Sequence, residues 1–406
     1  MYLGVDCGTQ STKVVVVDLA RGATIGEASR PHRMIEGDRG RREQDPAQWI
    51  EAFVGAFHAA IASAGVSAGD ICGIGVSGQQ HGMVALDARD QVLYPAKLWC
   101  DTETHAHNQA LIGALGGEQG CLARLGLVPQ TGYTASKVAW LREHHRDIYD
   151  RVDGVLLPHD YLNLWLTGER VSEAGDASGT GYFDSRSRRW CPEVWQWIAP
   201  ELDPTRVLPR LIDSRDAAGQ VRPALARELG LSPGVAVASG GGDNMLGAIG
   251  TGNIVPGRVT MSLGTSGTVC AHSDHPVVAD SAMVANFCAS HSGWLPLVCT
   301  MNTTSATNRV RELFDLDLAG FNQALAQAPI GADGVTVLPF FNGERVPSLP
   351  EASASFLGLT SRNTTPSHLC RAVVEGATFC LRYGLDLMGP LADQASQIRL
   401  IGGGAH

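Results

Sequence analysis

The chain has 406 residues and a formal net charge of −10, with 44% hydrophobic and 18% charged residues. This length predicts two or three domains of an ordinary soluble globular protein, and the acidic balance argues against nucleic-acid binding, because a phosphate backbone requires a basic surface. Ten cysteines without a CxxC pair, together with no visible signal peptide and no apolar run of membrane length, predict a reduced cytoplasmic protein that does not enter a membrane.

The chain opens with a predicted β-hairpin. Residues 2–6 and 13–18 read as strands, and because their turn joins strand to strand, a Walker loop or a dinucleotide fold does not fit. Backbone N–H groups and hydroxyls in such a turn can hold phosphate, and Asp6 is suitably placed to hold a hydrated Mg²⁺. A turn whose polar groups satisfy only their own backbone remains an alternative. The residues of the turn are Gly8, Thr9, Gln10 and Ser11.

A second hairpin of the same design follows at residues 258–271, with Gly264 and Thr265 in its turn. Aligning Gly8 with Gly264 overlays two strand–Gly-Thr–strand units, offset by 256 residues. A repeat at this distance predicts two domains of one design that face each other across a cleft. Two phosphate-holding hairpins on opposite walls would suit a nucleoside triphosphate.

Strands and helices alternate between and after the hairpins, which predicts sheets with helices packed on their faces. We expect the domain boundary near residue 246, giving domains of residues 1–246 and 247–406. The predicted strands are 71–77, 155–157, 235–239, 335–339 and the stretch before Gly402. The clearest predicted helices begin near Pro46 after the N-cap Asp45 and at Pro366 after the N-cap Thr365, and another follows residues 158–161.

Glycine-rich turns follow two buried strands, at the position from which open α/β sheets bind ligands. In the turn at residues 78–82, Gln80 and His81 offer an amide and an imidazole to hydroxyl groups, although a structural histidine is the alternative. In the turn at residues 240–244, Asp243 begins a helix. Asp243 is either only a cap, worth about 1 kcal/mol, or a base.

Three glycines before Asp243 favour the second interpretation, because they are costly in backbone entropy and suit the close approach of another group. A helix N-terminus also favours the ionised carboxylate. An ionised aspartate that faces a sugar hydroxyl can take its proton while the oxygen attacks phosphorus. A third glycine turn, residues 402–405, offers bare backbone on which an adenosine could lie.

Longer patterns give the chain a family resemblance. Residues 132–141 (GYTASKVAWL) and 354–375 are similar to the two diagnostic patterns of the FGGY family of carbohydrate kinases, and the resemblance covers essentially the whole chain. It implies an α/β fold of two actin-like ATPase (ribonuclease H-like) domains that face each other across a cleft. Within the family the chain most resembles the xylulokinases. The segments that carry this likeness are SGQQHG (77–82), EQDP (43–46), LLPHDYL (156–162), GGGDN (240–244) and LPFFNGERVP (338–347).

The resemblance implies ATP-dependent phosphorylation of D-xylulose to D-xylulose 5-phosphate, with Asp243 as catalytic base and Asp6 as the second catalytic carboxylate and Mg²⁺ ligand. The implied sugar contacts are Gln80, His81, Trp99, Asp101, Asp243 and Asn244. The implied phosphate and nucleotide contacts are Gly8, Thr9, Gln10, Ser11, Gly264, Thr265, Gly403, Gly404 and Ala405. Family members continue past the last glycine turn, so we expect further helices of the nucleotide domain beyond His406.

Three alternatives remain open. A kinase for another ketose or polyol, such as ribulose or glycerol, would share most of these residues. A non-catalytic sugar- or nucleotide-binding regulator would bind without transferring phosphate. An actin-like filament or chaperone ATPase would hydrolyse ATP without sugar. The assembly is also open, with a homodimer as one candidate.

Overall fold

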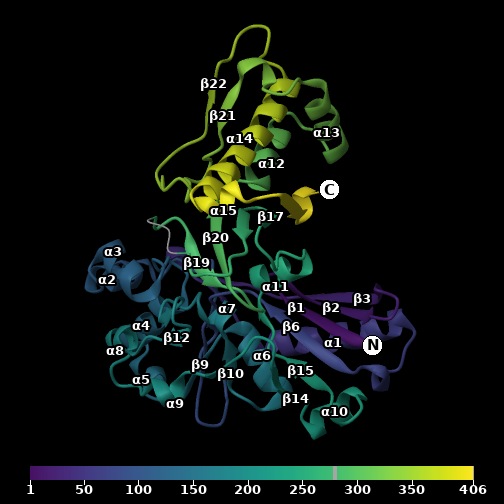
Figure 1. Ribbon diagram of the computed structural model, residues 1–406, viewed down its shortest axis with the longest axis vertical. Coiled ribbons are helices and arrows are strands. Elements are labelled where there is room, and N and C mark those ends of the chain that lie inside the picture. The colour runs from purple at the N-terminus through teal and green to yellow at the C-terminus, as the bar shows by residue number, and fades with distance from the viewer. Residues whose placement is uncertain (278–280, 406) are drawn as a thin grey trace. The chain divides into compact units, whose positions relative to one another are not determined.

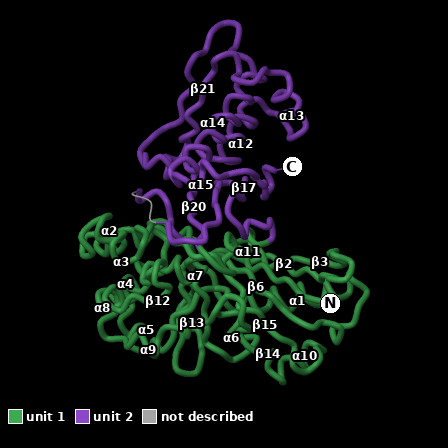
Figure 2. Tube along the Cα trace, in the orientation of Figure 1, with its two compact units in different colours: residues 1–249, 287–293 green, residues 250–286, 294–406 purple. Residues whose placement is uncertain are grey.

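The computed structural model describes residues 1–277 and 281–405. The chain forms two compact units, which Figure 2 colours separately. Unit 1 consists of Met1–Ile249 and Phe287–Gly293, and unit 2 consists of Gly250–Asn286 and Trp294–His406. The sequence predicts a division near residue 246, and the units divide after Ile249. The return of the segment Phe287–Gly293 to unit 1 has no counterpart in the sequence-based division.

Unit 1 is built on a seven-stranded mixed sheet (Figure 1). Strands β1 (Tyr2–Cys7) and β2 (Ser11–Asp18) pair antiparallel as the first hairpin, and β6 (Gly73–Gly78) lies parallel to β1 on its other side. Val14 and Val16 of β2 are fully buried, because alternate side chains of a strand point to the same face. The other strands of this sheet are β3 (Ala23–Pro31), β14 (Ala217–Gln220), β15 (Ala236–Ala238) and β16 (Gly241–Gly242).

Helix α1 (Pro46–Ala64) packs against β2 and β3. It begins as the sequence predicts, since the Asp45 side chain accepts a hydrogen bond from a first-turn backbone N–H and proline occupies the first helical position. Trp49, Phe53 and Phe57 recur every four residues and are buried in the core of the unit. Each such aromatic ring contributes about 1.5–3 kcal/mol by leaving water, so this face fixes the helix on the sheet.

Unit 2 repeats the strand order of unit 1. Strands β17 (Arg258–Leu263) and β18 (Gly267–Ala271) form the second hairpin, β23 (Gln397–Ile401) lies parallel to β17, and β20 (Trp294–Thr300) lies antiparallel to β18. The strands β20-β18-β17-β23 therefore match β3-β2-β1-β6 in their order along the chain and in their relative directions. This topology confirms the internal repeat that the two hairpins predict.

Helix α14 (Pro366–Asp386) covers strands of unit 2, with the Thr365 side chain as its N-cap. It approaches the sheet at Gly384, where a Cβ atom would lie 2.6 Å from Cγ1 of Val298. At Gly376 a Cβ atom would lie 2.4 Å from a backbone carbonyl of β21 (Thr336–Leu338). The helix can therefore lie this close only because these positions lack side chains.

The remaining elements are shorter or lie around the two sheets. The other helices of at least seven residues are α2 (His105–Ala114), α3 (Gly117–Leu125), α4 (Thr134–His144), α6 (Pro158–Thr167), α8 (Pro192–Ile198), α10 (Pro223–Leu229), α11 (Asp243–Gly250), α12 (Thr304–Leu313) and α13 (Leu318–Gln327). Small sheets pair β4 (Ile35–Glu36), β5 (Arg42–Gln44) and β8 (Ala96–Lys97), β7 (Val84–Leu86) with β9 (Gly154–Leu156), β10 (Val171–Glu173) with β13 (Arg210–Ile212), β11 (Phe183–Asp184) with β12 (Arg189–Trp190), and β21 with β22 (Ser355–Leu357). Short helices are α5 (Arg146–Tyr149), α7 (Ala174–Ala177), α9 (Pro204–Val207) and α15 (Pro390–Asp393).

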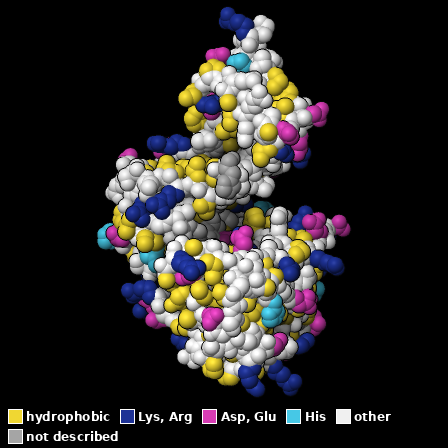
Figure 3. All heavy atoms as spheres, turned by 90° about the vertical axis from the view of Figure 1, so that its right-hand side faces the viewer, with side chains coloured by type: hydrophobic (Ala, Val, Ile, Leu, Met, Phe, Trp, Pro, Cys, Tyr) yellow, Lys and Arg dark blue, Asp and Glu magenta, His cyan; other side chains and the backbone are white. Residues whose placement is uncertain are grey.

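Two features of the described residues concern membrane insertion and nucleic-acid binding, which the composition argues against. No helix among them is long and apolar enough to cross a membrane. On the face that Figure 3 shows, lysine and arginine side chains are dispersed among acidic and neutral ones rather than gathered into one patch. This distribution agrees with the acidic net charge.

Candidate active site

Two carboxylates of unit 1 flank the end of strand β6. Asp6 on β1 pairs with Ser77 of β6, and Ser77 pairs on its other side with Gly241 of β16. Asp243 follows Gly241 by two residues and is the first residue of α11. Since adjacent strands lie about 4.8 Å apart, this topology brings Asp6 and Asp243 to the same edge of the sheet, one on each side of β6.

The surroundings of Asp243 raise the pKa of its carboxylate well above the ordinary value. Its side chain remains accessible to solvent, but the surrounding protein atoms desolvate it, and this raises its pKa to about 7, with the negative charge of Asp6 as the next cause. Its Oδ1 accepts hydrogen bonds from the backbone N and the Nδ2 of Asn244, at 2.8 and 3.1 Å. A carboxylate with this pKa is suited to accept and release a proton under physiological conditions.

Gln80 lies beside Asp243 with an unused hydrogen-bond donor. Its Oε1 accepts a bond of 3.0 Å from Nδ2 of Asn244, so Asn244 bridges Gln80 and Asp243. Gln80 is only 4% exposed, and its Nε2 has no hydrogen-bond partner among the described residues. A buried unpaired donor costs about 1–3 kcal/mol, which a ligand hydroxyl could recover.

His81 is held in an unusual backbone conformation next to Gln80. Its φ of 65° lies in the left-handed region that residues with side chains rarely adopt. The ring stacks on Tyr133 at 4.3 Å between centroids, and its Nδ1 donates to the carbonyl of Gly179 at 2.7 Å. Lys137 of α4 donates from Nζ to the carbonyl of His81 at 2.5 Å. These contacts fix the turn from three directions.

Lys137 is a positioning residue that the sequence reasoning used only as part of a family pattern. It is fully buried, and its Nζ also donates to the carbonyl of Gly132 at 2.5 Å. Burial is the main cause that lowers its pKa to about 7. The chain has only three lysines, Lys13, Lys97 and Lys137, and two of them are fully buried.

The shifted pKa of Lys137 predicts a pH-dependent stability. Between about pH 7 and the ordinary lysine value of 10.5 the unfolded chain binds a proton that the folded chain lacks, so folded stability rises with pH in this window. The slope for one proton is about 1.4 kcal/mol per pH unit. We expect the free energy of unfolding of wild type, relative to that of Lys137→Met, to increase between about pH 7.5 and about pH 8.5, as measured by urea denaturation. Parallel pH profiles of the two proteins would contradict it.

The three glycines before Asp243 are required by the protein's own packing. A Cβ atom would lie 2.4 Å from the carbonyl oxygen of Val76 at Gly240 and 2.6 Å from Oγ of Ser290 at Gly241. At Gly242 a Cβ atom would lie 2.7 Å from Cγ of Gln80. The close group that the sequence suggests is therefore protein, and the glycines allow Gln80 to pack directly against the turn that carries Asp243.

A buried charged layer supports this turn, and sequence reasoning missed it. Nδ1 of His159 lies 2.5 Å from Oδ2 of Asp176, and Nε2 lies 3.1 Å from Oδ1 of Asp160. Burial alone would lower the pKa of His159, but Asp160 and Asp176 outweigh it and raise the pKa to about 9. His159 and Asp160 stand in the segment LLPHDYL, directly after a buried strand, which was the available signal.

The turn of the first hairpin lies next to Trp99. Oγ1 of Thr9 accepts a bond of 2.9 Å from Nε1 of Trp99 and donates to Oε1 of Gln79 at 3.1 Å. The backbone N of Gly8 donates to the carbonyl of Ser11 at 3.0 Å, which closes the turn around Thr9 and Gln10. Trp99, which is 39% exposed, thus joins the expected phosphate residues.

Asp101, an expected sugar contact, is held by other groups of the protein. It is fully buried, its Oδ2 accepts from Nζ of Lys97 at 3.1 Å and from the backbone N of Arg42 at 2.8 Å, and its Oδ1 accepts from the backbone N of Glu103 at 3.1 Å. Both oxygens are therefore engaged by the protein. We accordingly leave Asp101 out of the proposed substrate contacts.

The expected nucleotide residues of unit 2 meet at one edge of its sheet. Strands β17 and β23 are parallel, so the turns after Leu263 and after Ile401 lie at neighbouring strand ends. A Cβ atom at Gly404 would lie 3.0 Å from the carbonyl oxygen of Leu263. The backbone N and Oγ1 of Thr304, at the start of α12, donate to the carbonyl of Gly264 at 3.0 and 2.8 Å. The expected residues gathered here are Gly264, Thr265, Gly403, Gly404 and Ala405.

Comparison with known proteins then decides the family. Residues 1–250 match the model of the N-terminal domain, and residues 259–406 match that of the C-terminal domain, of the FGGY family of carbohydrate kinases. The chain belongs to the FGGY family of carbohydrate kinases. This assignment confirms the predicted α/β fold and the expected class of enzyme, whose phosphoryl donor is ATP.

Individual FGGY kinases resemble the chain over its full length. A xylulose kinase from Haemophilus influenzae is 52% identical over 409 residues, covering 100% of this chain and 83% of that protein. A xylulose kinase from Streptomyces coelicolor is 40% identical, covering 100% of this chain and 80% of that protein. A crystal structure of a xyloylose kinase from Brucella ovis superposes with a TM-score of 0.93 at 34% identity, covering 100% of this chain and 82% of that one.

Proposed function

We propose that the chain transfers the terminal phosphoryl group of ATP to D-xylulose and forms D-xylulose 5-phosphate, with Asp243 as general base. Relatives named xylulose kinase, up to 52% identical over the whole chain, support the choice of sugar. The observation that carries the mechanism is the pair formed by Asp243, with a pKa of about 7, and Gln80, with its unpartnered buried Nε2. A cytoplasmic location fits the need for ATP and a free sugar.

The proposed chemistry uses few groups. Asp243 accepts the proton of the attacking hydroxyl while that oxygen forms a bond to the terminal phosphorus of ATP, and the bond from this phosphorus to the bridging oxygen breaks, so that ADP leaves. The Nε2 of Gln80 donates to a sugar hydroxyl, and Asn244 fixes the positions of the Gln80 and Asp243 side chains relative to each other. Positioning of the reactants contributes most of the rate in phosphoryl transfer.

The residues at the end of β6 fit a magnesium ion. Mg²⁺ prefers carboxylate, water and phosphate oxygens, and Asp6 offers such a carboxylate, which is exposed and accepts a bond of 3.0 Å from Oγ of Ser77. Surrounding protein atoms partly desolvate Asp6 and raise its pKa, and the charge of Asp6 raises the pKa of Asp243, so a cation would relieve both carboxylates. We propose that Asp6 holds Mg²⁺, which would neutralise charge on the phosphates.

Turnover of ATP with and without D-xylulose tests the proposal. We expect ADP release that depends on D-xylulose, and weaker or no release with D-ribulose or glycerol. ADP release with glycerol but not with D-xylulose would replace the sugar and keep the enzyme class. ADP release independent of any sugar, or sugar binding without turnover, would overturn the proposal in favour of an ATPase or a regulator.

The unpartnered amide of Gln80 predicts that its removal lowers kcat/KM for the sugar. Gln80→Leu removes the donor while it keeps a side chain of similar volume, so the sugar hydroxyl loses its partner. We expect kcat/KM for the sugar to fall by about 10- to 100-fold, with KM for ATP unchanged. Steady-state kinetics with each substrate varied measure both.

A matched control is Gln196→Leu, because Gln196 is an exposed amide on α8. This variant should keep wild-type constants. An unchanged kcat/KM for the sugar in Gln80→Leu would contradict the role of Gln80.

A further inference from the structure

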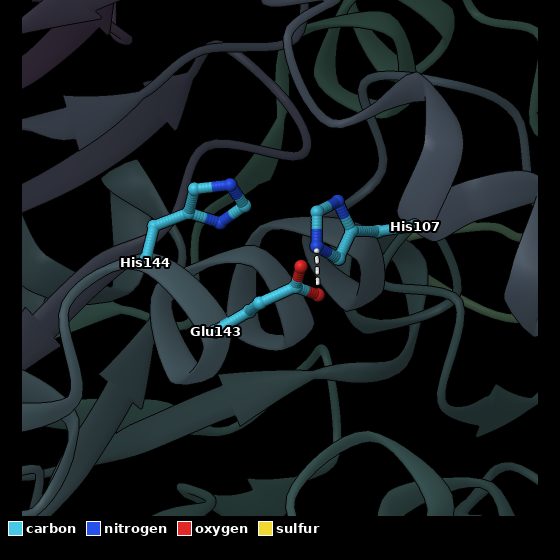
Figure 4. A group of neighbouring side chains, drawn as sticks. All are labelled: His107, Glu143 and His144. Carbon is cyan, nitrogen blue, oxygen red and sulfur yellow. Dashed lines mark hydrogen bonds and ion pairs between the residues drawn. The ribbon is translucent and has the colours of Figure 1, made fainter.

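A second group of ligand-type side chains lies on unit 1, separate from the residues discussed above. His107 comes from α2, and Glu143 and His144 come from the C-terminal end of α4. Figure 4 shows the three side chains converging from the two helices. One ligand atom from each lies within 4.8 Å of the other two. His107 Nε2 and Glu143 Oε2 are 3.0 Å apart.

A bound metal ion fixes the separation of its donor atoms, and these three ligand atoms lie within 4.8 Å of one another. Donor atoms that share a tetrahedral Zn²⁺ lie about 3.4 Å apart, given metal–ligand bonds of ~2.1 Å. The Glu143 side chain is 70% exposed and His144 is also exposed, so both have room to close on an ion. Two imidazoles and one carboxylate are a donor set for borderline ions such as Zn²⁺, whereas Mg²⁺ and Ca²⁺ prefer oxygen alone.

The contacts of His144 leave its Nε2 able to bind a metal ion. Its Nδ1 lies 3.1 Å from the backbone carbonyl of Trp140, and a carbonyl only accepts, so this contact places the proton on Nδ1 and the lone pair on Nε2. The ring also stacks on Trp140, at 5.1 Å between centroids and 13° between planes. A backbone acceptor on the second nitrogen is the usual companion of a metal-binding histidine.

His107 has one ring nitrogen beside Glu143 and a second that the described residues leave unpaired. Its side chain is 14% exposed, and its Nε2 faces Oε2 of Glu143. Its Nδ1 is buried without a hydrogen-bond partner among the described residues. The hydrogen bond to Glu143 therefore uses only one of the two ring nitrogens of His107.

A second cluster of ligand-type side chains in the described chain already surrounds a positive charge of the protein. Glu43, Asp101 and Glu103 also bring ligand atoms together, but Nζ of Lys97 lies among them at 2.5–3.1 Å and supplies the positive charge. Around Glu143, no lysine or arginine of the described residues forms such an ion pair, and the nearby Arg142 donates instead to the backbone of Trp197 and Ile198.

We propose that His107, Glu143 and His144 bind one divalent ion of the zinc type and thereby join α2 to α4. Water would complete the coordination on the exposed side. Because the ligands come from helices that are 36 residues apart in sequence between His107 and Glu143, the bound ion favours the folded state over the unfolded one.

Metal titration of the untagged, chelator-treated full chain tests the proposal. We expect one equivalent of Zn²⁺ by calorimetry, visible d–d absorption on addition of Co²⁺, and a higher Tm with Zn²⁺. Glu143→Gln and His107→Gln should each weaken binding about tenfold or more and remove the Tm shift. Since Glu143 is mostly exposed, Glu143→Gln should fold normally.

His105→Gln is the matched control, because His105 is an exposed histidine on the same helix that contacts Thr131 instead. Its metal affinity should equal that of wild type. Absence of Zn²⁺ binding by wild type, or equal affinity in wild type and Glu143→Gln, would overturn the proposal.

Discussion

Asp243→Asn is expected to lower kcat by about 10²- to 10⁴-fold, the contribution of a general base, while sugar and nucleotide still bind. Asparagine keeps the shape and the contact with Asn244 but cannot accept the proton. The matched control is Asp317→Asn, because Asp317 caps α13 through a bond from the backbone N of Gly320 and has no proposed catalytic role. Wild-type turnover in Asp243→Asn would remove the base assignment.

The same substitution should raise Tm, which separates lost chemistry from lost folding. The folded-state pKa of about 7 lies above the ordinary value of 3.8, so the folded chain holds its proton more tightly than the unfolded one. The ionised carboxylate therefore destabilises the folded state increasingly as pH rises from about 4 to 7. Asparagine removes this penalty. A residue retained at a cost in stability is typical of functional sites.

The acidic limb of the pH profile of kcat/KM also tests Asp243 as the general base. Since only ionised Asp243 can act as base, kcat/KM should fall as the pH drops through about 7. The profile of kcat/KM reports the free enzyme, to which this pKa refers. A profile that stays flat through pH 7 would contradict the assignment.

Lys97→Met is expected to destabilise the protein by about 3–5 kcal/mol, the cost of removing one partner from a buried ionic group. Lys97 is fully buried, and its Nζ lies 3.0, 3.1 and 2.5 Å from carboxylate oxygens of Glu43, Asp101 and Glu103. Burial alone would lower its pKa, but these three carboxylates outweigh it and raise the pKa. Methionine would leave their negative charges without their shared cation.

Urea denaturation at one pH measures the loss, with Lys13→Met as control. Lys13 forms an ion pair of 2.9 Å with Glu27, but the side chains are 50% and 61% exposed, so its removal should change stability by at most about 1 kcal/mol. Equal stabilities of the two variants would contradict a structural role of the buried cluster.

Much of the fold could be predicted because its signals are local. The run of valines in β2 predicts a strand, and Asp45 before Pro46 predicts the start of α1. Thr365 before Pro366 likewise predicts the start of α14. The repeated Gly-Thr hairpins predict the duplicated sheets, since one local design at two places implies one topology for both.

The site could be predicted only in part. Asp243 and Gln80 follow buried strands, which is a local signal, and the sheet register brings Asp6 and Asp243 to one edge. Trp99 and Asp101 are two residues apart, yet the fold places Trp99 against Thr9 and Asp101 against Lys97. Neighbouring residues in a loop have no fixed period, so sequence alone could not separate their roles.

The sequence by itself determined the family, the two hairpins and the aspartates that stand at strand ends, because each depends on residues near one another in the chain. Only the tertiary structure decided why three glycines precede Asp243, that His159 and Asp176 form a charged layer, and that Lys137 holds the carbonyl of His81. The two polar contacts join residues 17 and 56 positions apart, and the glycines meet residues such as Val76 and Gln80 that are still more distant in the chain. Such contacts arise because burying a charge requires a partner wherever the fold supplies one, and sequence spacing does not encode which partner that is.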